Sequence, residues 1–143
     1  MRRLRDDDGS VLPLAIFYGV LALALILLVV SATSLYLERK RLYTLADGAA
    51  LVGAEAFDLA DVRATDAGLR PTLQSPDVAT AVTTYVAEHP AAFDGLGVVQ
   101  AHTADGRSAT VTLEATWHPP LLSVLVPSGL RIEVTAVARS VFF

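Results

Sequence analysis

Residues 11–37 decide the fold, and they read VLPLAIFYGVLALALILLVVSATSLYL. The stretch contains no charged residue, and residues 11–30 are almost wholly apolar. At a rise of ~1.5 Å per residue, a helix of this length crosses a hydrocarbon core about 30 Å thick. The sequence therefore predicts a transmembrane helix over residues 11–37, with the rest of the chain displayed beside the membrane.

A short polar leader, residues 1–10, precedes this span with three arginines and then three aspartates. We expect the leader to be cytoplasmic and the downstream domain extracytoplasmic, because arginines favour the cytoplasmic side and an acidic domain is easily translocated. Basic residues 39–41 at the other end of the span weigh against this orientation. A cleaved secretory signal is the alternative, although the apolar run is longer than an ordinary signal core.

The helix is expected to continue outside the membrane as residues 38–60, because no helix breaker interrupts the stretch after the span. Small residues recur there at i, i+3, i+4 and i+7, which places them on one helical face. This helix-packing or interaction face consists of Ala46, Ala49, Ala50, Gly53, Ala56 and Phe57. Gly48 and Gly53 each cost about 1 kcal/mol of helix propensity, which favours close packing against the chain's own sheet or a neighbouring helix. One helix is predicted from residue 12 to about residue 59.

Residues 61–143 predict a small α+β domain of a size that can build its own core. A loop over residues 61–76 leads into a second helix, with Ser75 as N-cap and Pro76 at the first helical position. Strands at 97–103 and 108–117 flank Asp105-Gly106, a dipeptide typical of hairpins. Another strand covers 130–141, which gives a three-stranded, possibly four-stranded, antiparallel sheet.

Alternation along the later strands predicts which side chains face the core. The inward set is Ala109, Val111, Leu113, Ala115, Trp117, Ile132, Val134, Ala136 and Ala138. The apolar connection at residues 121–126 has three possible roles: a short helix over the sheet edge, a contact with the membrane surface, or a contact with a partner.

The stretch from residue 9 to residue 54 resembles the TadE/TadG-like family, the membrane-anchored, pilin-like proteins of the Tad (Flp-type) pilus assembly system. The family pattern after the span is Ala-Asp-x-Ala-Ala-Leu-x-Gly-Ala, matched here by Ala46, Asp47, Ala49, Ala50, Leu51, Gly53 and Ala54. The resemblance implies a pilin-like domain. It also implies partners among the Tad pilins and inner-membrane platform proteins, with a possible homo- or hetero-oligomer formed through the N-terminal helix.

The resemblance further implies a possible prepilin-peptidase site between Gly9 and Ser10. Family members that are cleaved and polymerised carry Glu at the fifth mature residue, which would be Leu14 here, and residues 10–37 contain no acidic residue. We therefore expect a minor pilin or pseudopilin-like component, retained in the cell membrane, rather than a main filament subunit.

No constellation of catalytic or metal-binding residues stands out. The predicted hairpin places His102 opposite Ala109 and brings neither His89 nor His118 to it. The chain has no cysteine, no Gly-x-Ser-x-Gly setting and no phosphate loop, and its acidic domain is unsuited to nucleic acid. We expect no enzyme activity, no cofactor, no metal and no nucleic-acid partner. The alternative to a pilus role is a membrane-tethered extracytoplasmic ligand-binding or regulatory domain.

Overall fold

The structure is a computed structural model, and it describes residues 11–57, 63–65, 68–70, 72–89, 93–120 and 127–139. The leader, the possible cleavage site at Gly9 and Ser10, and the apolar connection 121–126 lie outside these residues. The elements in chain order are α1 (Val11–Ala54), β1 (Arg63–Thr65), β2 (Gly68–Arg70), α2 (Ser75–Ala87), β3 (Gly97–His102), β4 (Ser108–Trp117) and β5 (Leu130–Arg139).

The predicted α+β class is confirmed, with a long apolar N-terminal helix, a second helix and a three-stranded antiparallel sheet of order β3-β4-β5. β1 and β2 form a separate two-stranded hairpin within the segment predicted as a loop. Each of these strands has three residues, which is too short to produce a readable alternation.

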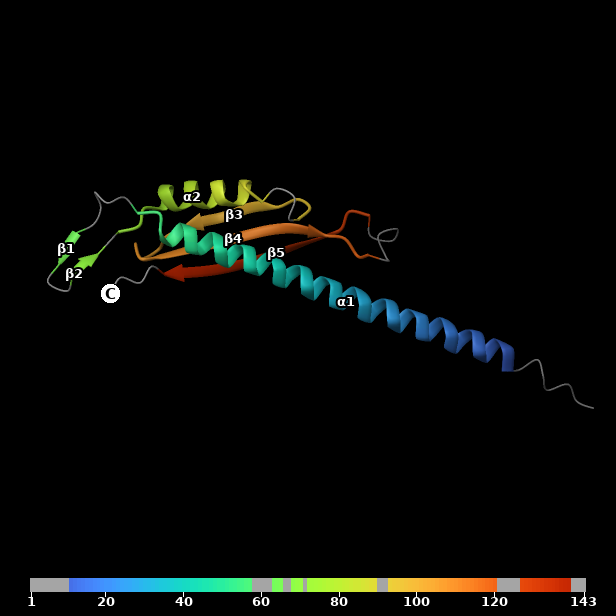
Figure 1. The fold of residues 1–143 in the computed structure, drawn as a ribbon. Coiled ribbons are helices and arrows are strands. Elements are labelled where there is room, and N and C mark those ends of the chain that lie inside the picture. The colour runs from blue at the N-terminus through green and yellow to red at the C-terminus, as the bar shows by residue number, and fades with distance from the viewer. Residues whose placement is uncertain are drawn as a thin grey trace, which may run out of the picture.

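The domain has two layers (Figure 1). The second half of α1 lies on β4 and β5, and α2 packs beside α1 and against β3, while the first half of α1 protrudes from the domain. The inward side chains of β4 are buried as predicted, and so are those of β5 up to Ala136, with Ala138 half-buried. The core therefore lies between one face of the sheet and the two helices.

α1 runs antiparallel to β4 and ends where the sheet ends. Ser34 contacts Trp117 at the end of β4, and Gly53 approaches Ala109 near its start. From Ser34 to Gly53 the helix rises ~28 Å, and from Trp117 back to Ala109 the strand covers ~26 Å. Helix and sheet thus match in length.

The prediction that the helix reaches about residue 59 is wrong, because α1 ends at Ala54. The N–H of Glu55 is shared between the carbonyls of Leu51 and Val52, and the N–H of Ala56 donates to the carbonyl of Gly53. Such bonds tighten a last helical turn. Beyond Gly53 there is no further length of β4 to cover the small-residue face, so continuing the helix would bury nothing more on the sheet.

The hairpin turn differs from the predicted two-residue turn. His102 pairs with Thr110 rather than with Ala109, and the register shifts by one residue between Val98 and Gln100. Asp105 causes the longer turn: one carboxylate oxygen accepts the N–H groups of Arg107 and Ser108 at 2.9 and 2.7 Å. These bonds fix a wider loop, in which Gly106 adopts a positive φ of 67°.

The predicted role of Ser75 as the N-cap of α2 is also wrong. The cap residue is Gln74, and it makes no side-chain cap bond. The Ser75 hydroxyl instead exchanges hydrogen bonds with the backbone of Thr103, at 3.3 and 3.2 Å. This residue therefore ties the start of α2 to the end of β3.

Candidate functional site: two faces of the long helix

The small-residue face predicted from the sequence lies inside the chain's own core. Ala46, Ala49 and Ala50 are 0% exposed, and Gly53 is buried with them. The partners of this face are the sheet and α2. A face that is fully covered within one chain is closed to a neighbouring helix.

Gly53 marks the closest approach of the three elements. A Cβ atom added there would lie 3.1 Å from side-chain atoms of both Val78 and Val82 on α2, and 3.2 Å from the Cβ of Ala109 on β4. At Gly48 the corresponding neighbour is the flexible side chain of Tyr85. The absence of a side chain at Gly53 therefore allows α1, α2 and β4 to meet.

Ala56 and Phe57, which were assigned to the same helical face, lie beyond the end of α1. Both are half-buried, and Phe57 packs against the edge of the hydrophobic core. They extend the apolar packing of the small-residue face without being part of a helix.

A second face of α1, turned by roughly a third of a revolution from the small-residue face, is exposed. On the domain half this face carries Tyr36, Lys40, Tyr43, Asp47 and Leu51, a set that we call the outer stripe. Its members follow one another at spacings of three or four residues, so they share one helical face. Hydrophobic periodicity does not reveal this stripe, because its members are a mixture of charged, aromatic and aliphatic residues; the aromatic pair at i and i+7 is the available signal.

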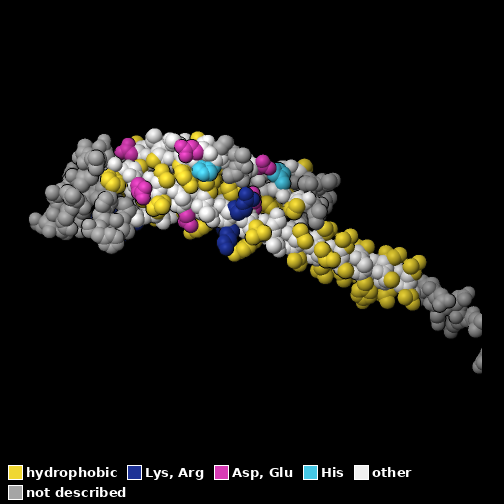
Figure 2. Space-filling model, in the orientation of Figure 1, with side chains coloured by type: hydrophobic (Ala, Val, Ile, Leu, Met, Phe, Trp, Pro, Cys, Tyr) yellow, Lys and Arg dark blue, Asp and Glu magenta, His cyan; other side chains and the backbone are white. Residues whose placement is uncertain are grey.

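On the protruding half of α1, residues 11–30, nearly all side chains are exposed and apolar, as Figure 2 shows. This is the one helix in the described part of the chain that is long and apolar enough to cross a membrane. Lys and Arg side chains appear where the domain begins (Figure 2). The surface of α1 is thus divided into an apolar rod and a mixed polar and aromatic outer stripe.

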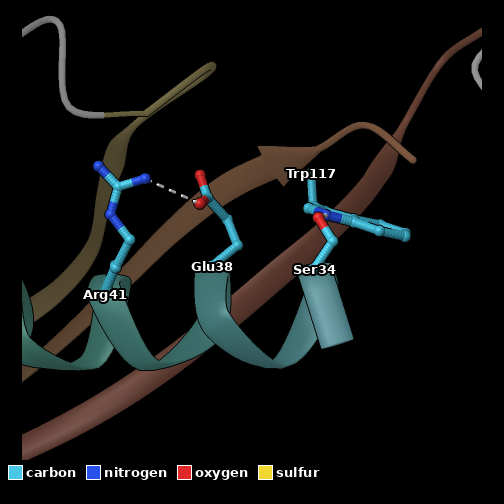
Figure 3. A network of polar contacts seen from close by, with 4 residues as sticks. All are labelled: Ser34, Glu38, Arg41 and Trp117. Atoms are coloured by element: carbon cyan, nitrogen blue, oxygen red, sulfur yellow. Dashed lines mark hydrogen bonds and ion pairs between the residues drawn. The ribbon is translucent and has the colours of Figure 1, made fainter. Parts of the chain in front are cut away.

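Polar contacts join α1 to the sheet at the point where the helix enters the domain (Figure 3). The indole Nε1–H of Trp117 donates to the Ser34 hydroxyl at 3.3 Å. One turn further along, Arg41 pairs with Glu38 at 3.3 Å and its guanidinium lies 5.6 Å from the centre of the Phe93 ring. The bond between Trp117 and Ser34 ties α1 to the end of β4, whereas the pair of Arg41 and Glu38 lies within α1.

The histidines lie apart, and the buried Nδ1 of His102 has no hydrogen-bond partner among the described residues. Nδ1 of His89 lies 2.8 Å from the carbonyl of Tyr85, His102 sits at the end of β3, and His118 lies 3.6 Å from the carboxylate of Asp94. Within the described residues, no three His, Asp or Glu side chains gather closely enough to hold a metal ion. Ser108 donates to the second carboxylate oxygen of Asp105 at 3.1 Å, a contact at the exposed hairpin turn.

Comparison with known proteins bears on this same helix. A family model described as putative Flp pilus-assembly TadE/G-like matches residues 9–56, about a third of the chain. The resemblance inferred from the sequence is confirmed over that stretch, whose limits nearly coincide with those of α1. No curated protein and no solved structure matches the chain.

Proposed function

We propose that this chain is a membrane-anchored, minor pilin or pseudopilin-like component of a Flp-type (Tad) pilus assembly system. The observation that carries the proposal is the coincidence between the family match and α1: the stretch similar to pilus-assembly proteins is the anchor together with the helix that organises the domain. The family description names an assembly system and no catalytic activity, which supports a structural role.

Residues 11–30 would hold the protein in the cell membrane, with the N-terminus cytoplasmic and the domain outside. Their length and exposed apolar surface support this anchor. Lipid is then the first partner of α1, and other spanning helices of the apparatus can pack against the same rod.

Lateral association would use the outer stripe, because the small-residue face is occupied by the chain's own core. The stripe carries opposite charges at Lys40 and Asp47 and aromatic rings at Tyr36 and Tyr43, so it can form both ion pairs and ring contacts with a neighbouring helix. Opposite charges flanked by aromatic side chains favour one register over others.

Site-directed cross-linking in cells tests this proposal, and the natural absence of cysteine gives a clean background. Tyr43→Cys places a thiol on the outer stripe, and Glu133→Cys places one on the exposed face of β5 as the matched control. We expect Tyr43→Cys to give cross-links to Tad pilins, to platform proteins or to a second copy, and Glu133→Cys to give none of these. Identical cross-linking patterns, or adducts only with proteins outside the pilus system, would contradict the proposal.

A further inference from the structure

We propose that the membrane-facing end of the domain rests in the headgroup layer of the bilayer, so that lipid is a second contact surface in addition to the span. We call this end the membrane-side rim and define it by the exposed side chains of Tyr36, Leu37 and Leu130, with the buried Trp117 beside Leu130 in the sheet. The proposal rests on the membrane anchor proposed above and is independent of any role in pilus assembly.

The first argument concerns depth along α1. If residues 11–30 fill a hydrocarbon core of ~30 Å, Ser34 lies ~6 Å beyond its edge, within a headgroup layer of roughly 5–7 Å. If the uncharged residues 11–37, ~40 Å long, are instead centred in the whole bilayer, Ser34 lies at the hydrocarbon edge itself. Either placement puts Ser34 in the interface.

The second argument is that the sheet begins at the same depth. Trp117 is bonded to Ser34, and Leu130 is the cross-strand partner of Trp117. Because β4 runs toward this end and β5 runs away from it, both strand ends reach the level of the interface together. The domain therefore has no stalk separating it from the membrane.

The third argument is the chemistry of the rim. Leu130 is 48% exposed at the start of β5, and Tyr36 and Leu37 are exposed on α1. Tyr prefers the interfacial layer, where its apolar ring and its polar hydroxyl are both accommodated. The exposed apolar side chains of the rim follow directly on the exposed span, and that continuity identifies their occupant as lipid.

Charged groups near the rim do not oppose this contact. Three basic side chains near it lie beside a carboxylate: Arg41 beside Glu38, Arg131 beside Glu114, and His118 beside Asp94. Arg39 and Lys40 lie exposed one turn above the rim, where cations are attracted to anionic headgroups. In a bilayer that contains anionic lipid, the apolar rim can lie among the headgroups while Arg39 and Lys40 contact the negative charges.

Trp117 is the single tryptophan of the chain, so its fluorescence reports on the rim alone. The full-length protein is reconstituted into vesicles of phosphatidylcholine and phosphatidylglycerol that carry bromine on the acyl chains near the headgroups. The control is the double variant Trp117→Phe, Val137→Trp, whose indole sits at the exposed far end of β5. Val137 lies about 23 Å beyond Leu130 along the strand.

We expect brominated lipid to cause a loss of Trp117 emission and no loss from the Val137→Trp control. A second pair of variants tests the contact itself: Leu130→Glu should reduce the quenching of Trp117, while Val137→Glu should leave it unchanged. Unquenched Trp117 in protein that floats with the vesicles would overturn the rim contact and leave the anchor standing. Equal quenching at both ends would also overturn it, and protein that fails to float would remove both the anchor and the contact.

Discussion

At Gly53 a single missing side chain lets three elements meet. The two valines on α2 and Ala109 on β4 occupy the space that a Cβ would enter, with contacts of 3.1–3.2 Å. A glycine inside a helix costs about 1 kcal/mol relative to alanine, so the site has a helical cost that close packing offsets. The sequence therefore predicts close packing at Gly53, and the folded domain shows which side chains are the close neighbours.

Gly53→Leu should destabilise the domain by about 1–3 kcal/mol or more, because the added carbons have no room between α1, α2 and β4. The melting temperature, followed by circular dichroism in detergent, should fall by roughly 4–8 °C for each kcal/mol. Gly19→Leu is the matched control, since nothing lies within 4 Å of a Cβ at that position. Equal melting temperatures for the two variants would remove the argument for close packing.

Asp105 predicts a pH dependence of the hairpin turn. Backbone N–H groups, first that of Arg107 and then that of Ser108, lower the pKa of the Asp105 carboxyl below its ordinary value. A lowered pKa means that the charged form stabilises the folded state above the unfolded value of about 4. This contribution is lost as the pH falls through the lower, folded value.

The variant Asp105→Asn serves as the reference for that effect, because it keeps an acceptor oxygen but does not titrate. The difference in melting temperature between the natural chain and the variant should shrink as the pH is lowered from about 5 to about 2.5. The carboxyl carbon of Asp105, followed by NMR, should titrate below the ordinary aspartate value. A difference that stays constant with pH would show that the turn does not depend on the charge.

At the scale of the element, α1 is one uninterrupted helix whose first half forms the proposed membrane span and whose second half covers the sheet. Its residues up to 30 lie almost entirely outside the core, whereas Leu42, Ala46 and Ala50 are fully buried. The change occurs near Ser34, where the indole of Trp117 reaches the helix. Domain stability should therefore depend on the second half of the helix and very little on the first.

A chain beginning at residue 31 should keep its fold, because residues 11–30 add almost nothing to the core. A chain beginning at residue 55 should not fold, because it lacks the helix that covers β4 and β5. Thermal unfolding and the dispersion of amide NMR signals distinguish the two fragments. Loss of structure in the longer fragment would mean that the protruding half is part of the folding unit.

The sequence predicts those features of α1 and the sheet that follow from burial alone. The small-residue face and the inward residues of β4 and β5 show a period of 3.6 or 2, because each of these elements has one covered face. The apolar span is recognised instead by its unbroken length and its lack of charge. α1 ends at Ala54 because the sheet that it covers ends there. A helix end that is set by the length of the sheet leaves no periodic signal in the sequence. The helix end was therefore predicted too late.

Other features were set by single side chains whose partners cannot be read locally. Asp105 selects a wider turn than Asp-Gly normally forms, and this moved His102 opposite Thr110. Ser75 has a partner 28 residues away, at Thr103, rather than in its own helix. The outer stripe mixes charged and aromatic residues, so hydrophobic periodicity alone does not reveal it.

At the scale of the whole molecule, the first half of α1 is proposed to span the membrane, and the domain is proposed to lie on the outer surface of that membrane. The absence of cysteine allows this orientation to be tested with single thiols. Val137→Cys, at the exposed far end of β5, should react in intact cells whose outer barrier passes the reagent. A thiol introduced in the leader, Arg3→Cys, should react only after the inner membrane is opened. The reverse pattern would invert the proposed topology.

The central claim is that this chain works in Flp pilus assembly, and the most direct measurement is the number of surface pili per cell, counted by electron microscopy after deletion of the gene. We predict that pili are lost or sharply reduced. They should return with the full-length chain and fail to return with a chain that begins at residue 31. An unchanged number of pili in the deletion strain would contradict the account.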